Sequence, residues 1–126
     1  MLYADYEYYS QTYNGTVPKE EAEKALKQAC RHIDTLTYNR IVGKGFENLT
    51  EFQQGIIKEC ACMMADFEHS NSEMINSLIN SYSLNGVSVS FGGEGANYAL
   101  VSGIVVQRDT YSYLGQTGLT SRNLGV

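Results

Sequence analysis

PKEEAEKALKQACRHIDTL, residues 18–36, predicts an amphipathic helix that forms one wall of the core. Pro18 suits the first turn of a helix, where its missing N–H is not needed. Glu20 and Glu21 follow it, and negative charge is favourable at a helix N-terminus. The apolar residues recur at helical spacing and define the face that we expect to be buried: Ala22, Ala25, Leu26, Ala29, Ile33 and Leu36.

A second long helix is predicted downstream, from Thr50 to about residues 69–72. Thr50 and Gln53 have the spacing of a capping box, in which each side chain satisfies a backbone N–H of the other residue. We expect this helix to be the most buried one. Its predicted apolar stripe consists of Phe52, Ile56, Cys60, Met63 and Phe67, widened by Ile57 and Met64.

The tyrosine-rich N-terminus predicts a short first helix. Leu2, Tyr6, Tyr9 and Tyr13 are spaced along one helical stripe. The pair Asn14-Gly15 then provides a stop. Between the two long helices, residues 42–48 are expected to form a loop.

Beyond residue 79 the pattern changes from helical to alternating. Polar and apolar residues alternate on both sides of Asn85-Gly86, which is a strong hairpin signal. We therefore expect a two-stranded hairpin over about residues 79–92. Residues 92–95 (Gly-Gly-Glu-Gly) match no phosphate-binding loop and are expected to act as a hinge.

A final helix is predicted over residues 98–113, although the β-branched run Ile104-Val105-Val106 is also compatible with a strand. Residues 115–126 lack a periodic core, and we expect an extended tail that is ordered only against another surface. The predicted fold is mainly α: a small bundle of about four helices with one hairpin, forming a domain over residues 1–114, followed by that tail.

The composition of the chain disfavours several classes of function. The 126 residues fit one domain and carry a formal net charge of −5, which disfavours affinity for nucleic acid phosphates. The N-terminus lacks the features of a signal peptide, and no apolar run approaches the length of a membrane span. We therefore expect a soluble cytoplasmic protein without membrane association, whose three cysteines are reduced thiols.

Catalytic chemistry has few candidates in this sequence. Cys60 and Cys62 point roughly 200 degrees apart on a helix, and no second ligand pair completes a metal site. His32 and His69 lie in predicted helices without a nucleophile turn beside them. The carboxylates are dispersed along the sequence, which is typical of solvated surface residues and not of a paired acid–base site. We expect no catalysis, metal or cofactor.

Four segments, in this order, resemble the head–tail connector (adaptor) family of long-tailed bacteriophages and Gram-positive prophages. They are YADYEYYSQTYNGT (residues 3–16), VPKEEAEKALKQACRHIDTLTYNRI (17–41), SYSLNGVSVSF (81–91) and YLGQTGL (113–119). The resemblance implies a helical subunit of a ring, expected to have twelve copies, beneath the portal protein. Such a ring lies in the virion neck, assembles in the host cytoplasm, contacts the next neck or head-closure protein, and lets DNA pass without specific binding.

The resemblance also implies where partners bind. The C-terminal segment is expected to dock on the portal, through Tyr113, Leu114, Thr117, Gly118, Leu119, Arg122 and Val126. The predicted hairpin is expected to face the tail, through Asn85, Gly86, Val87, Val89 and Phe91. After Leu119 the sequence departs from the family pattern, and only Arg122, Gly125 and Val126 have counterparts.

Two hypotheses of function remain as alternatives to the connector. A monomeric factor that acts transiently in the neck or in tail completion has the same interaction features. A small hydrolase or thiol enzyme would use Cys60 or Cys62 with His32 or His69.

Overall fold

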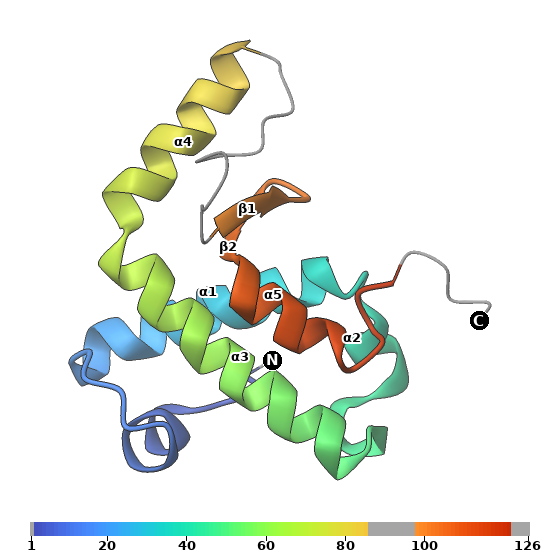
Figure 1. Cartoon of the computed structure of the whole chain (residues 1–126). Helices are drawn as coiled ribbons and strands as arrows, with labels where there is room; N and C mark the ends of the chain where they lie inside the picture. The colour runs from blue at the N-terminus through green and yellow to red at the C-terminus, as the bar shows by residue number, and fades with distance from the viewer. Residues whose placement is uncertain (1, 86–97, 122–126) are drawn as a thin grey trace.

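The computed structural model describes residues 2–85 and 98–121, and its fold class is the predicted one: mainly helical, with a single two-stranded antiparallel sheet in the described ranges (Figure 1). None of the described helices has the length and hydropathy needed to cross a bilayer. In chain order the elements are η1 (Tyr8–Thr12), α1 (Lys19–Leu36), α2 (Arg40–Lys44), η2 (Phe46–Asn48), α3 (Glu51–Ser70), α4 (Ser72–Asn85), β1 (Tyr98–Val101), β2 (Ile104–Gln107) and α5 (Arg108–Gly115).

Helix α3 is the central element, packed against α1 and α5 (Figure 1). The predicted start of α1 is confirmed, since the helix begins directly after Pro18. The capping box of α3 is also confirmed: Gln53 N donates to Thr50 Oγ1 at 3.1 Å, and Thr50 N donates to Gln53 Oε1 at 3.0 Å. Small side chains on both helices, including Ala29 and Ala61, are fully buried in the core.

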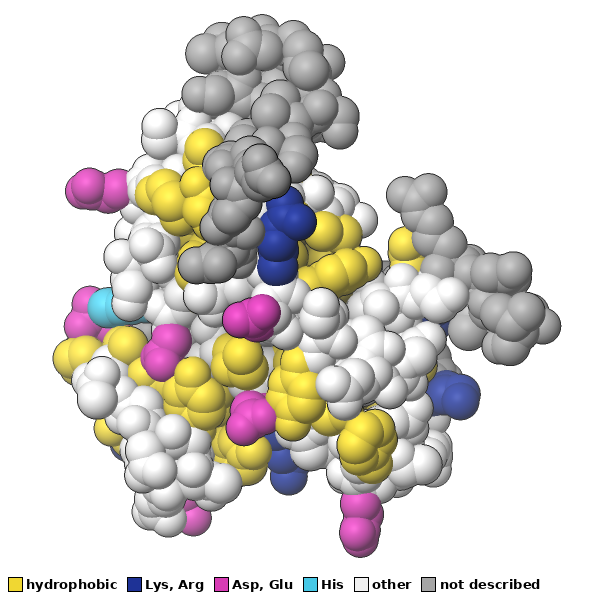
Figure 2. Space-filling view, viewed as in Figure 1, with side chains coloured by type: hydrophobic (Ala, Val, Ile, Leu, Met, Phe, Trp, Pro, Cys, Tyr) yellow, Lys and Arg dark blue, Asp and Glu magenta, His cyan; other side chains and the backbone are white. Residues whose placement is uncertain are grey.

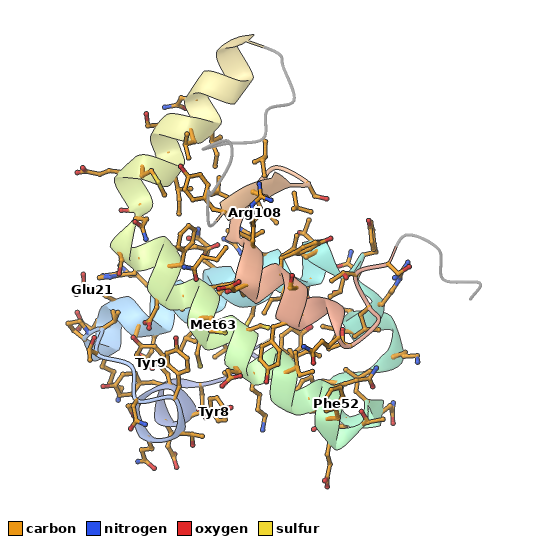
Figure 3. The ribbon with its side chains drawn as sticks, in the orientation of Figure 1. Tyr8, Tyr9, Glu21, Phe52, Met63 and Arg108 are labelled. Carbon is orange, nitrogen blue, oxygen red and sulfur yellow. The ribbon has the colours of Figure 1, made fainter. Side chains whose placement is uncertain are left out.

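One position of the predicted α3 stripe is wrong. Phe52 is 62% exposed, because it lies in the first turn, before α3 enters the bundle (Figure 3). The residues that fill the core from α3 are Ile56, Ile57, Cys60, Ala61, Cys62, Met64 and Ala65.

The N-terminal tyrosines close one side of the bundle. Residues 6–12 are helical, with a π-helical turn in η1, and Asn14 has a positive φ of 64° at the predicted stop. Tyr9 is fully buried and points toward α3, where its hydroxyl donates to Asp66 Oδ1 at 2.5 Å and accepts from Val17 N at 3.0 Å (Figure 3). The hydroxyl of Tyr3 donates to Asp34 of α1. Hydrogen bonds thus join this segment to both long helices.

The predicted position of the hairpin is wrong. Residues 79–85 belong to helix α4, and residues 86–92 lie outside the described part of the chain. In α4 the apolar residues Met74, Ile75, Leu78 and Ile79 follow a helical stripe, which outweighs the short alternation that follows it.

The antiparallel strands are instead β1 and β2, where a helix was predicted. A two-residue turn joins them, and both of its residues have positive φ, 52° at Ser102 and 81° at Gly103, as a type I′ turn requires. The β-branched run Ile104-Val105-Val106 is therefore a strand. The final helix, α5, begins only at Arg108.

Two expected irregular segments are more ordered than predicted. Residues 42–48 include part of α2 and all of η2. Residues 116–120 form turns in which Thr117 and Leu119 are buried, so the first part of the predicted tail belongs to the folded bundle. Residues 122–126 lie outside the described part.

Gly15 provides a test of how the N-terminal tyrosines pack against the bundle. A Cβ atom at Gly15 would lie 2.0 Å from Cζ of the buried Tyr9 ring. We expect Gly15→Ala to lower the free energy of unfolding by about 2–3 kcal/mol, because the ring has no free space to move into. Urea denaturation measures this loss.

Gly55→Ala is the matched control. Gly55 lies in α3, and no side chain comes within 4 Å of the point that its Cβ atom would occupy. Alanine should therefore raise stability by about 0.5–1 kcal/mol through helix propensity. Equal midpoints for Gly15→Ala and the wild type would contradict the placement of Tyr9.

Candidate interaction surface

The closing segment, residues 113–119, ends α5 and forms the turn after it. Leu114, Thr117 and Leu119 are 0%, 7% and 5% exposed, and Gly118 has a positive φ of 79°. Tyr113 is half-buried. The structure therefore brings these five residues together, but it places three of the side chains inside this chain's own core.

Hydrogen bonds from two other helices hold that turn. Gln53 Nε2 of α3 donates to the Thr117 carbonyl oxygen at 3.0 Å. The Arg40 guanidinium of α2 donates to the carbonyl oxygen of Leu119 at 3.0 Å and to that of Ser121. A portal contact through this segment remains a prediction, and Arg122 and Val126 lie outside the described residues.

The second predicted group is only partly described. Asn85 is the last residue of α4, whereas Gly86, Val87, Val89 and Phe91 lie outside the described ranges.

Helix α4 is packed less closely against the other described elements than α1, α3 and α5 are. It leaves the bundle as an arm that continues beyond the end of α3 (Figure 1), and none of residues 72–80 is buried. Its apolar stripe stays half-buried, and Figure 2 shows hydrophobic side chains at the surface along α4. The residues of this stripe are Met74, Ile75, Leu78 and Ile79.

The hairpin has one partly exposed strand. Every residue of β1 is half-buried, whereas Ile104, Val105 and Val106 of β2 are buried. Arg108 lies at the start of α5, beside the hairpin (Figure 3), and its Nε donates to the Tyr98 carbonyl oxygen at 3.3 Å. We call the α4 stripe and β1 together the arm surface.

A cavity of about 140 Å³ lies between α4, β2 and α1. Its polar lining includes Glu68 and His32, whose Oε2 and Nδ1 atoms are 2.5 Å apart, together with Gln28, Ser72 and Asn76. Nearby, His69 Nε2 and Glu21 Oε1 form a more exposed pair at 3.2 Å. Sequence reasoning missed the first pair, although Glu68 follows Met64 by four residues and so continues the apolar face of α3.

The thiols are poorly suited to nucleophilic chemistry. Cys60 and Cys62 are fully buried, and burial raises the pKa of each to about 12, with nearby carboxylates adding to the shift. In the described ranges neither histidine is hydrogen-bonded to a thiol. Also within those ranges, His, Cys, Asp and Glu side chains form no group of three that could hold a metal ion.

No family model, curated protein or solved structure matches the chain. The assignment of function therefore depends on the geometry described above and on the resemblance of the four sequence segments.

Leu119 tests whether the closing segment belongs to the core. We expect Leu119→Ala to lower the free energy of unfolding by about 2–5 kcal/mol, because it leaves a cavity beneath the turn. Leu2→Ala makes the same chemical change at a residue that is 50% exposed and should have a much smaller effect. Equal losses in the two variants, measured by urea denaturation, would argue against a buried turn.

Stability should fall in alkaline solution. Burial raises the pKa of Tyr9 from its usual value of about 10 to about 12, and the hydrogen bond to Asp66 is the second cause of this shift. The usual pKa of a thiol is about 8.5. Above the usual thiol pKa the unfolded chain releases protons from Cys60 and Cys62 that the folded chain retains. The contribution of these groups is therefore complete below about pH 8.5 and is lost progressively toward pH 12.

Urea denaturation with a reductant present, from pH 7.5 to 10.5, measures this loss. Cys62→Ala should make the free energy of unfolding depend less steeply on pH, because the variant lacks one of the groups whose pKa is raised by folding. A free energy of unfolding that stays constant over this range would contradict the burial of these groups.

Proposed function

We propose that the chain is a structural subunit of a phage head–tail connector, which forms a ring on the portal protein and extends the DNA channel. Support from the sequence comes from the order of the four segments that resemble this family. One of them, residues 17–41, contains α1, and another, residues 113–119, contains the turn that completes the core.

The observation that carries the proposal is the arm surface. A ring subunit must present two different patches, each complementary to a patch on its neighbour or on another protein. The α4 stripe and β1 remain half-buried in the single chain, and the α4 stripe lies on a helix that extends from the bundle (Figures 1 and 2). Half-buried apolar side chains of this kind gain free energy when a partner removes them from water.

The charge of the chain agrees with a DNA channel that does not retain DNA. Its formal net charge is −5, so the molecule as a whole repels phosphates. Strong attraction to each phosphate would slow the passage of DNA. The buried thiols with raised pKa values favour this assembly role over a thiol hydrolase.

The test is light scattering after size exclusion, on the chain alone and mixed with its cognate portal protein. We expect the full chain to co-elute with the portal. Leu78→Glu should weaken the complex at least tenfold, because it places a charge in the arm surface, whereas Ser77→Glu adds the same charge at an exposed position of α4 and should not.

A chain that ends at Ser121 tests the tail separately. It keeps Leu119 in the core, whereas a chain ending at Leu114 would remove buried residues and confuse loss of folding with loss of binding. Loss of portal binding on removing residues 122–126 is the result expected for tail docking.

Failure of the folded full chain to bind the portal would contradict the connector proposal. Binding during assembly without persistence in finished particles would favour the transient neck or tail-completion factor.

A further inference from the structure

The cavity beside α4 contains an unsatisfied acidic group. Glu68 is only 9% exposed, and its Oε2 is 2.5 Å from Nδ1 of His32. Its other oxygen, Oε1, is buried without a hydrogen-bond partner, and it is the one such side-chain atom among the described residues. A buried carboxyl oxygen without a donor is unfavourable by roughly 1–3 kcal/mol, so a donor is expected to occupy the space beside it.

That space has room for more than a single water molecule. The cavity measures about 140 Å³, whereas a single water needs roughly 10–15 Å³ by a comparable measure. Its walls are mixed: Ile75 and Ile79 of α4 and Ile104 and Val105 of β2 are aliphatic, whereas Gln28, Ser72 and Asn76 are polar. The cavity therefore combines an acidic group with an aliphatic surface on one side.

This combination fits one class of ligand. Lysine and arginine side chains have an aliphatic stem that packs against apolar surface and a cationic head that donates hydrogen bonds to a carboxylate. An aliphatic chain would leave Glu68 Oε1 without a donor, a neutral donor would form a weaker hydrogen bond than a cationic one, and an anion would be repelled by the carboxylate.

A neighbouring groove offers a path for a polypeptide that carries such a side chain. The groove shares Gln28, Glu68, Ser72 and Asn76 with the cavity and continues to the His69–Glu21 pair. Lys24 also lines the groove, but it forms no ion pair with Glu68.

We propose that the Glu68 cavity is a receptor for a lysine or arginine side chain of a partner protein, whose backbone lies along the adjoining groove. This site does not depend on the connector proposal, since it follows from the carboxylate, the cavity and its aliphatic surface alone.

The test is NMR titration of the full chain with small probes, observing the His32 ring signals. n-Butylammonium and n-butylguanidinium should produce saturable shifts, and the neutral 1-pentanol should bind at least tenfold more weakly. Glu68→Gln should weaken the two cations at least tenfold, since a hydrogen bond to a charged group contributes about that much. Glu73→Gln is the matched control, because it removes an exposed carboxylate of α4 that does not line the cavity.

A second variant keeps Glu68 intact. Asn76→Phe places a ring at the mouth of the cavity and should weaken both cations while thermal unfolding confirms the fold. Equal affinity in Glu68→Gln and the wild type, or no saturable shift with either cation, would overturn the proposal. A tenfold gain in affinity on Lys24→Ala would also overturn it, because Lys24 would then be the occupant.

A final comparison distinguishes a cationic side chain of a protein from a free amine as the occupant of the cavity. N-acetyl-lysine methylamide represents a side chain of a protein, and 1,4-diaminobutane represents a free amine. We expect the lysine derivative to bind at least as tightly as the diamine. Binding of the diamine tenfold tighter would assign the cavity to a free polyamine and overturn the partner-protein assignment.

Discussion

The packing of α1 on α3 is the constraint on which the rest of the structure depends. The two helices pack against each other, and both contribute small, fully buried side chains, such as Ala29 and Ala61, to the core. Other segments then pack onto this pair. The N-terminal tyrosines close it through Asp34 and Asp66, and α5 with its following turn closes it through Gln53 and Arg40.

Sequence patterns predicted the elements whose signals are local. Proline and a capping box mark where α1 and α3 begin, and their apolar stripes are long enough to be unambiguous. The hairpin was misplaced because Asn85-Gly86 is a strong turn signal and Ser102-Gly103 a weaker one. Strand β2 also shows no alternation, since three consecutive residues from Ile104 are buried. Alternation marks a strand with one face in water, and this strand has none.

The features from which binding is proposed depend on residues that are distant in the sequence. Glu68 resembles a surface carboxylate in sequence, and only the fold brings His32, 36 residues away, to 2.5 Å from it. Leu119 resembles part of a free tail until Gln53 and Arg40 are seen to hold the backbone around it. The segment expected to bind the portal thus completes the core, while the α4 arm and β1 keep apolar surface partly exposed. The division between core and contact surface therefore differs from the one that the sequence suggests.

Hydrogen exchange with and without the cognate portal tests this division most directly. Amides of residues 72–80 have few buried neighbours and should exchange quickly in the free chain, then become protected on binding. Amides of α1 and α3 should be protected in both states. Protection gained only in residues 113–121, or in no segment, would contradict the assignment of the α4 arm as the contact surface.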